Sequence, residues 1–296
     1  MSTLTVTRDG RPTQFAVPPR RRLPTFAALG RTVLILVFVL ISLFPFYWMV
    51  ITSFKTTADL NQGTHSLLPT SFSLSAYRND FAQYDYWRNV LNSAVVALST
   101  TAITVVVGSA AGYALARTRL RGKPVLLGFI LVAGFFPIMA MVGPLFLTFS
   151  HAHWVDSPLT LIASYLVYTL PIAIWFLANF FSQIPVEIEE AAVVDGLTRL
   201  RALFRVVVPV AMPGVLTAAI LSFILAWNDF TFALSFTQTP SHYTAPLAIS
   251  NLGHSQFQVF PNMIDAAVVV VTIPIALLVL AAQRRIVSGF TSGSTK

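Results

Sequence analysis

The chain alternates long apolar runs with short polar segments rich in arginine, and this pattern predicts membrane-spanning helices. About 20 apolar residues, each rising about 1.5 Å, cross a hydrocarbon layer of about 30 Å. Six stretches with almost no charge reach this length: between Arg31 and Lys55, between Arg88 and Arg117, between Lys123 and His151, from Pro158 to about Phe181, from about Pro213 to Phe236, and from about Met263 to Gln283. We therefore expect an all-α polytopic membrane protein with six transmembrane helices.

Prolines inside these stretches predict kinks, because proline removes a backbone hydrogen bond and membrane helices tolerate this where neighbours satisfy the freed carbonyl. Several of the six stretches contain one or more: Pro45, Pro137, Pro144, Pro171 and Pro274.

The basic residues predict the orientation, because Lys and Arg are enriched on the cytoplasmic side of membrane proteins. With the N-terminus in the cytoplasm, all but three of the 19 Lys and Arg residues fall in inside segments, the exceptions being Lys55, Arg78 and Arg88. Both termini are therefore expected inside. The expected parts are a tail over 1–31, a transmembrane domain over 32–283 and a tail over 284–296, with an inside loop over 182–212 and outside loops over 56–89 and 237–262.

Composition excludes several classes of protein. The chain is 55% hydrophobic and 10% charged, whereas soluble domains have roughly 45–50% and 25%, so a soluble single-core protein is excluded. Without cysteine there is no disulfide and no thiolate zinc site. The net charge of +8 does not indicate a nucleic-acid partner, because the basic residues lie between apolar runs and not on one face.

Candidate chemistry within the chain is sparse. The His151 and His153 pair has no further His or Cys nearby, so no metal site is expected. No P-loop, dinucleotide fingerprint or Ser-His-acid arrangement is present, so the chain is not expected to be an enzyme or to hydrolyse ATP itself.

The inside loop predicts two short helices. The first is expected to start at Pro185 and to stop at Gly196, with three acidic residues at its positive N-terminal end: Glu187, Glu189 and Glu190. The second is expected over 198–208, where Pro209 limits its extension. On amphipathicity alone, this basic second segment could instead be an interfacial helix on anionic lipid.

This loop also resembles the E-A-A signature of permease subunits of ATP-binding-cassette (ABC) importers. Glu190-Ala191-Ala192 is followed four positions on by Gly196 and then, after nine intervening residues, by Val206-Val207-Val208-Pro209, where the family favours Ile-x-Leu-Pro. Fixed residues at fixed spacing, between the spans where the family places them, make the resemblance specific.

Further stretches resemble the second permease subunit of carbohydrate importers of the maltose-permease type. They are Pro45-Phe46-Tyr47-Trp48, Thr52-Ser53-Phe54-Lys55, Asn92-Ser93, Gly112-Tyr113-Ala114-Leu115-Ala116-Arg117, Ile184-Pro185 and Trp227-Asn228-Asp229-Phe230. The tail over 283–293, with Ser255-Gln256-Phe257, leans toward the trehalose importers of actinobacteria.

The resemblance implies the ABC type I importer permease fold and import of a neutral oligosaccharide, such as the disaccharide trehalose or a maltose-like sugar, across the cytoplasmic membrane of a bacterium. It implies a homologous permease subunit, two ATPase subunits that hold ATP and Mg, and an extracytoplasmic sugar-binding protein or lipoprotein as partners, with no cofactor on this chain. The alternative is an ion-coupled secondary carrier. Such a carrier needs titratable groups in the membrane, and the spans offer only Asp229 and Asp265 near their outer ends.

Three groups of candidate site residues follow. The resemblance assigns contact with the ATPase to residues of the inside loop: Glu187, Glu190, Ala191, Ala192, Asp195, Gly196 and Pro209. A substrate path is expected at Trp227, Asn228 and Asp229, where an aromatic plane can stack on a sugar and polar groups can bind hydroxyls; the alternative is an interfacial Trp beside a helix-packing Asn. The last outside loop is expected to contact the binding protein through Asn251, Ser255, Gln256 and Phe257.

Overall fold

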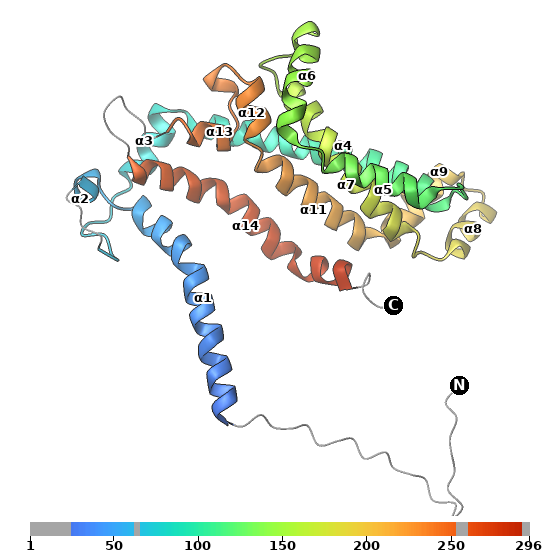
Figure 1. The fold of residues 1–296 in the computed structure, drawn as a ribbon, viewed down its shortest axis with the longest axis horizontal. Helices are drawn as coiled ribbons and strands as arrows, with labels where there is room; N and C mark the ends of the chain where they lie inside the picture. The colour runs from blue at the N-terminus through green and yellow to red at the C-terminus, as the bar shows by residue number, and fades with distance from the viewer. Residues whose placement is uncertain (1–24, 62–65, 253–259, 292–296) are drawn as a thin grey trace, which may run out of the picture. The chain divides into compact units, whose positions relative to one another are not determined.

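The computed structural model describes residues 25–61, 66–252 and 260–291, and in these ranges every regular element is a helix (Figure 1). The four longest are α1 (Thr25–Ser53), α4 (Tyr86–Arg117), α7 (Pro158–Phe181) and α14 (Pro261–Thr291). Each contains a stretch that is long and apolar enough to cross a membrane. These helices match the first, second, fourth and sixth predicted spans.

The third predicted span is broken in two. Helix α5 (Lys123–Gly134) and helix α6 (Ile138–His151) meet at a bend of 81°. Pro137 lies directly before α6 with an extended backbone, ψ 117°, so the helix cannot continue through it. The other four prolines named above lie inside helices that run on through them, at Pro45, Pro144, Pro171 and Pro274.

The fifth predicted span is shorter than expected, because α11 (Met212–Trp227) does not reach Phe236. A separate helix, α12 (Thr231–Phe236), follows after a break at 228–230. The Asp229 carboxylate accepts the backbone N–H groups of Phe232 and Ala233 at 3.0 and 3.3 Å, so it caps the start of α12. The expectation of one helix from Pro213 to Phe236 is therefore wrong.

Helices α4, α7 and α11 lie side by side and form the core of the part from Met49 onward (Figure 1). Glycines bring α4 and α7 close together: a Cβ atom at Gly112 would lie 3.0 Å from the backbone nitrogen of Ala178. Helix α5 packs on α7, and α14 packs on α11. A cluster of buried aromatic side chains joins α7 to α12: Tyr165, Tyr168, Phe232 and Phe236.

Short elements gather at the two ends of α4 and α7. At one end lie α3 (Ser75–Gln83), a 3₁₀ turn (Pro240–His242) and α13 (Ala245–Ile249), and at the other lie α8 (Val186–Val194) and α9 (Arg199–Ala202) (Figure 1). A further short helix, α2 (Thr57–Asn61), follows α1. After α9 the chain continues through a π-helical turn (Leu203–Val207) and α10 (Val208–Val210) before it bends by 86° into α11.

Candidate functional site

Helix α8 has well-defined ends. Pro185, where the helix is expected to start, instead occupies the N-cap position one residue before the first helical residue, Val186, and Gly196 follows the C-cap with φ +89°. The backbone N–H of Gly196 donates to the Val193 carbonyl, and that of Leu197 donates to the Ala192 carbonyl, at 3.0 and 3.1 Å. These bonds form a Schellman motif, which needs a left-handed residue at this position. The predicted helix stop at Gly196 is confirmed.

Helix α8 exposes most of the residues expected to contact the ATPase. The exposed ones are Glu187, Glu190, Ala191, Asp195 and Gly196, whereas Ala192 is buried against the rest of the chain. Apolar side chains are exposed beside them, above all Val194, of which 86% is accessible. A short helix that presents small and apolar residues between acidic ones is suited to enter a cleft in another protein.

The segment after α8 differs from the expected single helix over 198–208. Thr198 caps α9 by accepting the backbone N–H of Arg201, but the helix then widens into the π-helical turn before Pro209. The wider turn accommodates the missing N–H and the ring of Pro209, so the chain stays helical as far as Val210. Pro209 is exposed, and the helical segment ends one residue after it, at Val210, two residues beyond the predicted end.

A polar cluster that the sequence did not reveal fixes α8 to the end of α4. Glu189 is 7% exposed, and its carboxylate pairs with Nε of Arg117 at 2.8 Å and accepts a hydrogen bond from the Tyr113 hydroxyl. Arg117 also donates through Nη1 to the Ile184 carbonyl at 3.2 Å. Arg117 therefore holds both the start of α8 and the segment that leads into it.

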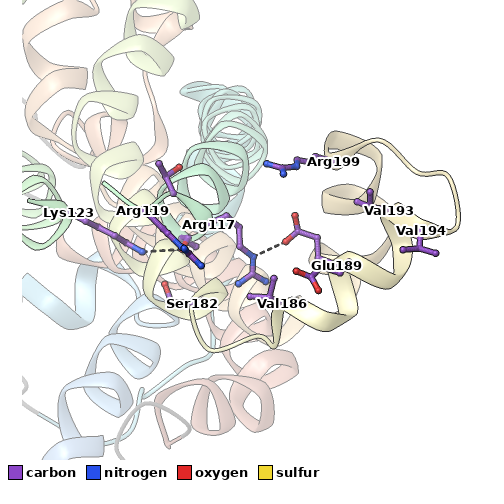
Figure 2. Close-up of a pocket in the computed structure, with 12 residues that line it drawn as sticks. Arg117, Arg119, Lys123, Ser182, Val186, Glu189, Val193, Val194 and Arg199 are labelled. Atoms are coloured by element: carbon purple, nitrogen blue, oxygen red, sulfur yellow. Dashed lines mark hydrogen bonds and ion pairs between the residues drawn. The ribbon is translucent and has the colours of Figure 1, made fainter. Parts of the chain in front are cut away.

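This cluster lies beside a cavity of about 770 Å³ between α4, α5, α8 and α9. Figure 2 shows Arg117 directed toward Glu189, with Arg199 on the α9 side. The lining includes four basic residues, Arg117, Arg119, Lys123 and Arg199, and two acidic ones, Glu189 and Glu190. Arg117, which positive-inside counting treats only as a topology anchor, is thus a structural partner of α8.

The two helix breaks meet at a second cavity, of about 650 Å³. Residues 134–138, at the α5–α6 bend, line it together with Tyr168 and Ile172 of α7 and residues 224–225 and 228–231 around the end of α11. Asn228 and Asp229 line this cavity, but Trp227 does not. Trp227 is buried, stacks on Phe223 and donates its indole N–H to the Val271 carbonyl at 3.2 Å.

The loop after α12 is tied to the turn before α7 by Asp156. Its carboxylate accepts the backbone N–H groups of Gln238 and Thr239 and the Thr239 hydroxyl, and lies 3.2 Å from Nδ1 of His242. Partial burial acts to raise the pKa of Asp156, but the hydrogen bonds from Thr239 and Gln238 outweigh it and lower the pKa to about 2.

This shift predicts a pH-dependent stability. A carboxylate with a depressed pKa stabilises the fold above its ordinary pKa of 3.8, and the contribution is lost as the pH falls toward 2. The thermal midpoint of the wild type in detergent should exceed that of Asp156→Asn at pH 6, and the difference should vanish near pH 2. An equal difference at both pH values would contradict the role of the charge.

Of the expected contacts to a binding protein, Asn251 is exposed just after α13, and Ser255, Gln256 and Phe257 lie outside the described residues. Within residues 25–61, 66–252 and 260–291, no three His, Cys, Asp or Glu side chains are grouped as metal ligands would be.

The sequence of this chain matches a known protein family. The sequence model of the binding-protein-dependent transport system inner membrane component matches residues 104–292, which include α8 and both helix breaks. The chain belongs to this family. It is therefore a membrane component of an ABC importer and not itself an enzyme, and the predicted resemblance to ABC permeases is confirmed.

Individual relatives match nearly the whole chain. The trehalose transport system permease protein SugB of Mycobacterium tuberculosis (strain CDC 1551 / Oshkosh) is 42% identical over 256 residues, 86% of this chain and 93% of that protein. The sulfoquinovosyl glycerol transport system permease protein SmoH of Agrobacterium fabrum (strain C58 / ATCC 33970) is 39% identical over 254 residues, 86% and 89% of the two chains.

A solved structure shares the fold. The crystal structure of a bacterial ABC transporter involved in the import of the acidic polysaccharide alginate contains a chain that matches with a TM-score of 0.74 at 22% identity, over 88% of this chain and 96% of that one. The predicted all-α importer permease fold is confirmed.

Proposed function

We propose that this chain is one of two homologous permease subunits of an ATP-driven importer for a neutral oligosaccharide, with trehalose as the first candidate and a maltose-like sugar as the second. The observation that carries the proposal is the 42% identity with a trehalose permease over 86% of the chain. The importer would include two ATPase subunits, which bind ATP and Mg, and an extracytoplasmic sugar-binding protein or lipoprotein. This chain itself would bind no cofactor.

Helix α8 is the proposed contact with the ATPase. Glu187 and Glu190 are exposed, and acidic groups at a helix start would pair with basic groups in a protein socket but would be repelled by an anionic membrane surface. The interfacial alternative concerns the basic segment that follows, where Leu200 and Phe204 are exposed. That segment can lie against lipid while α8 contacts the ATPase.

The proposed topology places both termini and α8 in the cytoplasm of a bacterium and the loop over 237–262 outside. Because the chain has no cysteine, single cysteines report sidedness without background. Val194→Cys should react with an impermeant maleimide only in inside-out vesicles, and Asn251→Cys only in right-side-out vesicles. The opposite pattern would contradict the topology.

The same Asn251→Cys variant tests the proposed contact with the binding protein. A short bifunctional crosslinker should join it to the sugar-loaded binding protein, whereas a cysteine at Leu147 on α6, an exposed apolar residue in a predicted span, should not be joined. Equal crosslinking of the two would exclude a specific contact at Asn251.

The second cavity favours a neutral sugar over an anionic one. Its lining combines four aromatic residues, Phe135, Phe136, Tyr168 and Phe230, with the polar Asn228, Asp229 and Thr231, and it contains no Lys, Arg or His. Aromatic faces and hydrogen-bonding groups suit a sugar ring, whereas a sulfonate or carboxylate would face Asp229 without a cation to pair with. We propose Asn228 and Asp229 as the part of the substrate path in this chain. Trp227 would support it from the core.

Asn228→Leu tests this path. The change keeps the bulk but removes hydrogen bonds of about 1 kcal/mol each, so KM for uptake should rise about five-fold for each bond lost. The assembled complex should elute from size-exclusion chromatography as the wild type does. Unchanged uptake kinetics in a normally assembled complex would remove Asn228 from the path.

The ion-coupled carrier is not supported, because the family assignment is to binding-protein-dependent importers. The proposed function is tested by coexpressing this chain with the homologous permease and the ATPase subunits and purifying this chain by an affinity tag. An ATPase should copurify, and the binding protein loaded with trehalose should stimulate its turnover. Stimulation by sulfoquinovosyl glycerol but not by trehalose would overturn the proposed sugar class, and failure of any ATPase to copurify would overturn the whole proposal.

A further inference from the structure

Helix α4 is held by polar side chains at both of its ends. Near its start, Asn89 donates to the carbonyls of Pro240 and Tyr243 at 3.0 and 3.1 Å. Asn92 donates to the carbonyls of Ser241 and Tyr243 at 2.9 and 3.0 Å. These bonds, which we call the outer clamp, fix the segment 240–243 to α4.

Ser93 completes the outer clamp, because its buried hydroxyl accepts the backbone N–H of Ala245 at 2.8 Å. The inner clamp lies at the other end of the same helix. It consists of the Arg117–Glu189 ion pair, the Tyr113 hydroxyl on Glu189 and the bond from Arg117 to the Ile184 carbonyl. Each clamp fixes a segment far away in sequence to the side of α4.

The helix between the clamps is continuous. It runs for 32 residues with no proline inside, whereas α5 and α6 are separated by a bend and α11 ends at a break. From Asn89 to Arg117 the rise is about 42 Å, which exceeds a hydrocarbon thickness of about 30 Å. Both clamps therefore lie near or beyond the membrane surfaces, and one stiff helix connects them.

The Arg117–Glu189 ion pair makes the inner clamp hard to break. Side-chain exposure is 16% for Arg117 and 10% for Glu189, so water screens the pair only weakly. Removing one partner of such a pair leaves an unpaired, largely buried charge. Helix α8 can therefore shift only if the end of α4 shifts with it or the pair is broken.

We infer that α4 acts as a connecting rod between the outer loop segment over 240–245 and α8, with Asn92, Arg117 and Glu189 as its positioning residues. The inference rests on the proposed function, in which the outer loop contacts the binding protein and α8 contacts the ATPase. Docking of the loaded binding protein displaces the outer clamp, α4 moves as a unit, and the inner clamp carries the movement to α8. The signal to the ATPase thus travels along α4.

The first test is charge exchange at the inner clamp in the complete transporter, measured as the fold stimulation of ATP hydrolysis by trehalose-loaded binding protein. Arg117→Glu and Glu189→Arg should each lower the stimulation about tenfold or more. The double exchange restores an ion pair and should recover at least half of the wild-type stimulation. Arg121→Glu is the matched control, because Arg121 lies in the adjoining turn and makes no ion pair within the described residues.

The second test asks whether the two clamps act through the same helix. Asn92→Ala and Arg117→Lys should each reduce the stimulation. The double variant should lose little more than the more impaired of the two single variants, because once either clamp is broken α4 no longer transmits the movement. Losses that multiply in the double variant would show independent effects and would overturn the rod. A double exchange that recovers nothing while the complex remains assembled would overturn it as well.

These results separate the inference from the proposed function. If the wild-type complex itself shows no sugar stimulation, the proposed function fails. If the wild type is stimulated and the Arg117 and Glu189 variants are stimulated equally, the proposed function stands and only the rod is refuted.

Discussion

Gly196→Asp is expected to leave an inserted subunit that either loses the ATPase during solubilisation or hydrolyses ATP without transport. Gly196 has φ +89°, a conformation that costs a residue with a side chain about 1 kcal/mol or more. Within this chain, a Cβ atom there would meet nothing within 4 Å. An effect larger than the local strain must therefore come from a partner that approaches this turn.

Gly122 provides the matched control. It has φ +84°, and a Cβ atom there also meets nothing within 4 Å, but it lies in the turn between α4 and α5, outside the proposed ATPase contact. Gly122→Asp introduces the same strain and the same charge. Sugar uptake should fall at least tenfold more in Gly196→Asp than in Gly122→Asp, whether the Gly196→Asp complex has lost the ATPase or hydrolyses ATP without transport. Equal losses in both would mean that strain alone is responsible.

Ala191→Trp extends this test without changing the backbone. Ala191 is exposed on α8, so a large ring there costs this chain little but would fill a cleft that receives the helix. The variant should insert normally and lose the ATPase. Normal uptake by it would show that α8 is only a surface helix.

Gly112→Leu is expected to disrupt the packing of α4 on α7. A Cβ atom at Gly112 would lie 3.0 Å from the Ala178 backbone nitrogen and 3.3 Å from the Ile174 carbonyl oxygen, so the two helix backbones would have to separate. Overpacking of this kind costs roughly 1–3 kcal/mol, and a membrane bundle that depends on close approach has few ways to relax. The thermal midpoint in detergent should fall by several degrees, as measured by fluorescence-detected size-exclusion chromatography.

Gly108→Ala is the control for this prediction, one turn away on the same face of α4. Its Cβ atom would lie 3.4 Å from the Ala173 Cβ, which is close to ordinary contact with a side chain, so the midpoint should stay near that of the wild type. A Gly112→Leu variant as stable as Gly108→Ala would contradict the close approach of α4 and α7.

The apolar runs predicted α1, α4, α7 and α14 well. A helix that spans the hydrocarbon layer needs an apolar stretch along its whole length, and such a stretch can be read from length and composition. The breaks could not be predicted in this way, because they depend on single local bonds. Only one of five prolines, Pro137, breaks a helix, and α11 ends where the Asp229 carboxylate caps α12. From the sequence, Asp229 is expected in the substrate path, and the apolar pattern does not show that a new helix starts after it.

The residues proposed to contact the ATPase follow from a family motif, whereas the ion pair of the inner clamp was missed because its two partners are 72 residues apart. A helical repeat would have placed Glu189 with Ala192, on the opposite side from Glu187 and Glu190, and so marked it as the inward-facing acid. Its partner, Arg117, could not be identified in this way, because only the packing of α4 against α7 brings the end of α4 to α8.

The central claim is that this chain belongs to an importer driven by ATP hydrolysis on a partner, and uptake in proteoliposomes tests it most directly. Complexes of this chain with the homologous permease subunit and the two ATPase subunits are reconstituted with trehalose-loaded binding protein. ATP is held constant at the ATPase face, and ionophores collapse the proton and sodium gradients. We expect trehalose uptake to continue at the same rate and to stop when ATP is replaced by a non-hydrolysable analogue. Uptake driven by a proton or sodium gradient in the absence of ATP would contradict the account.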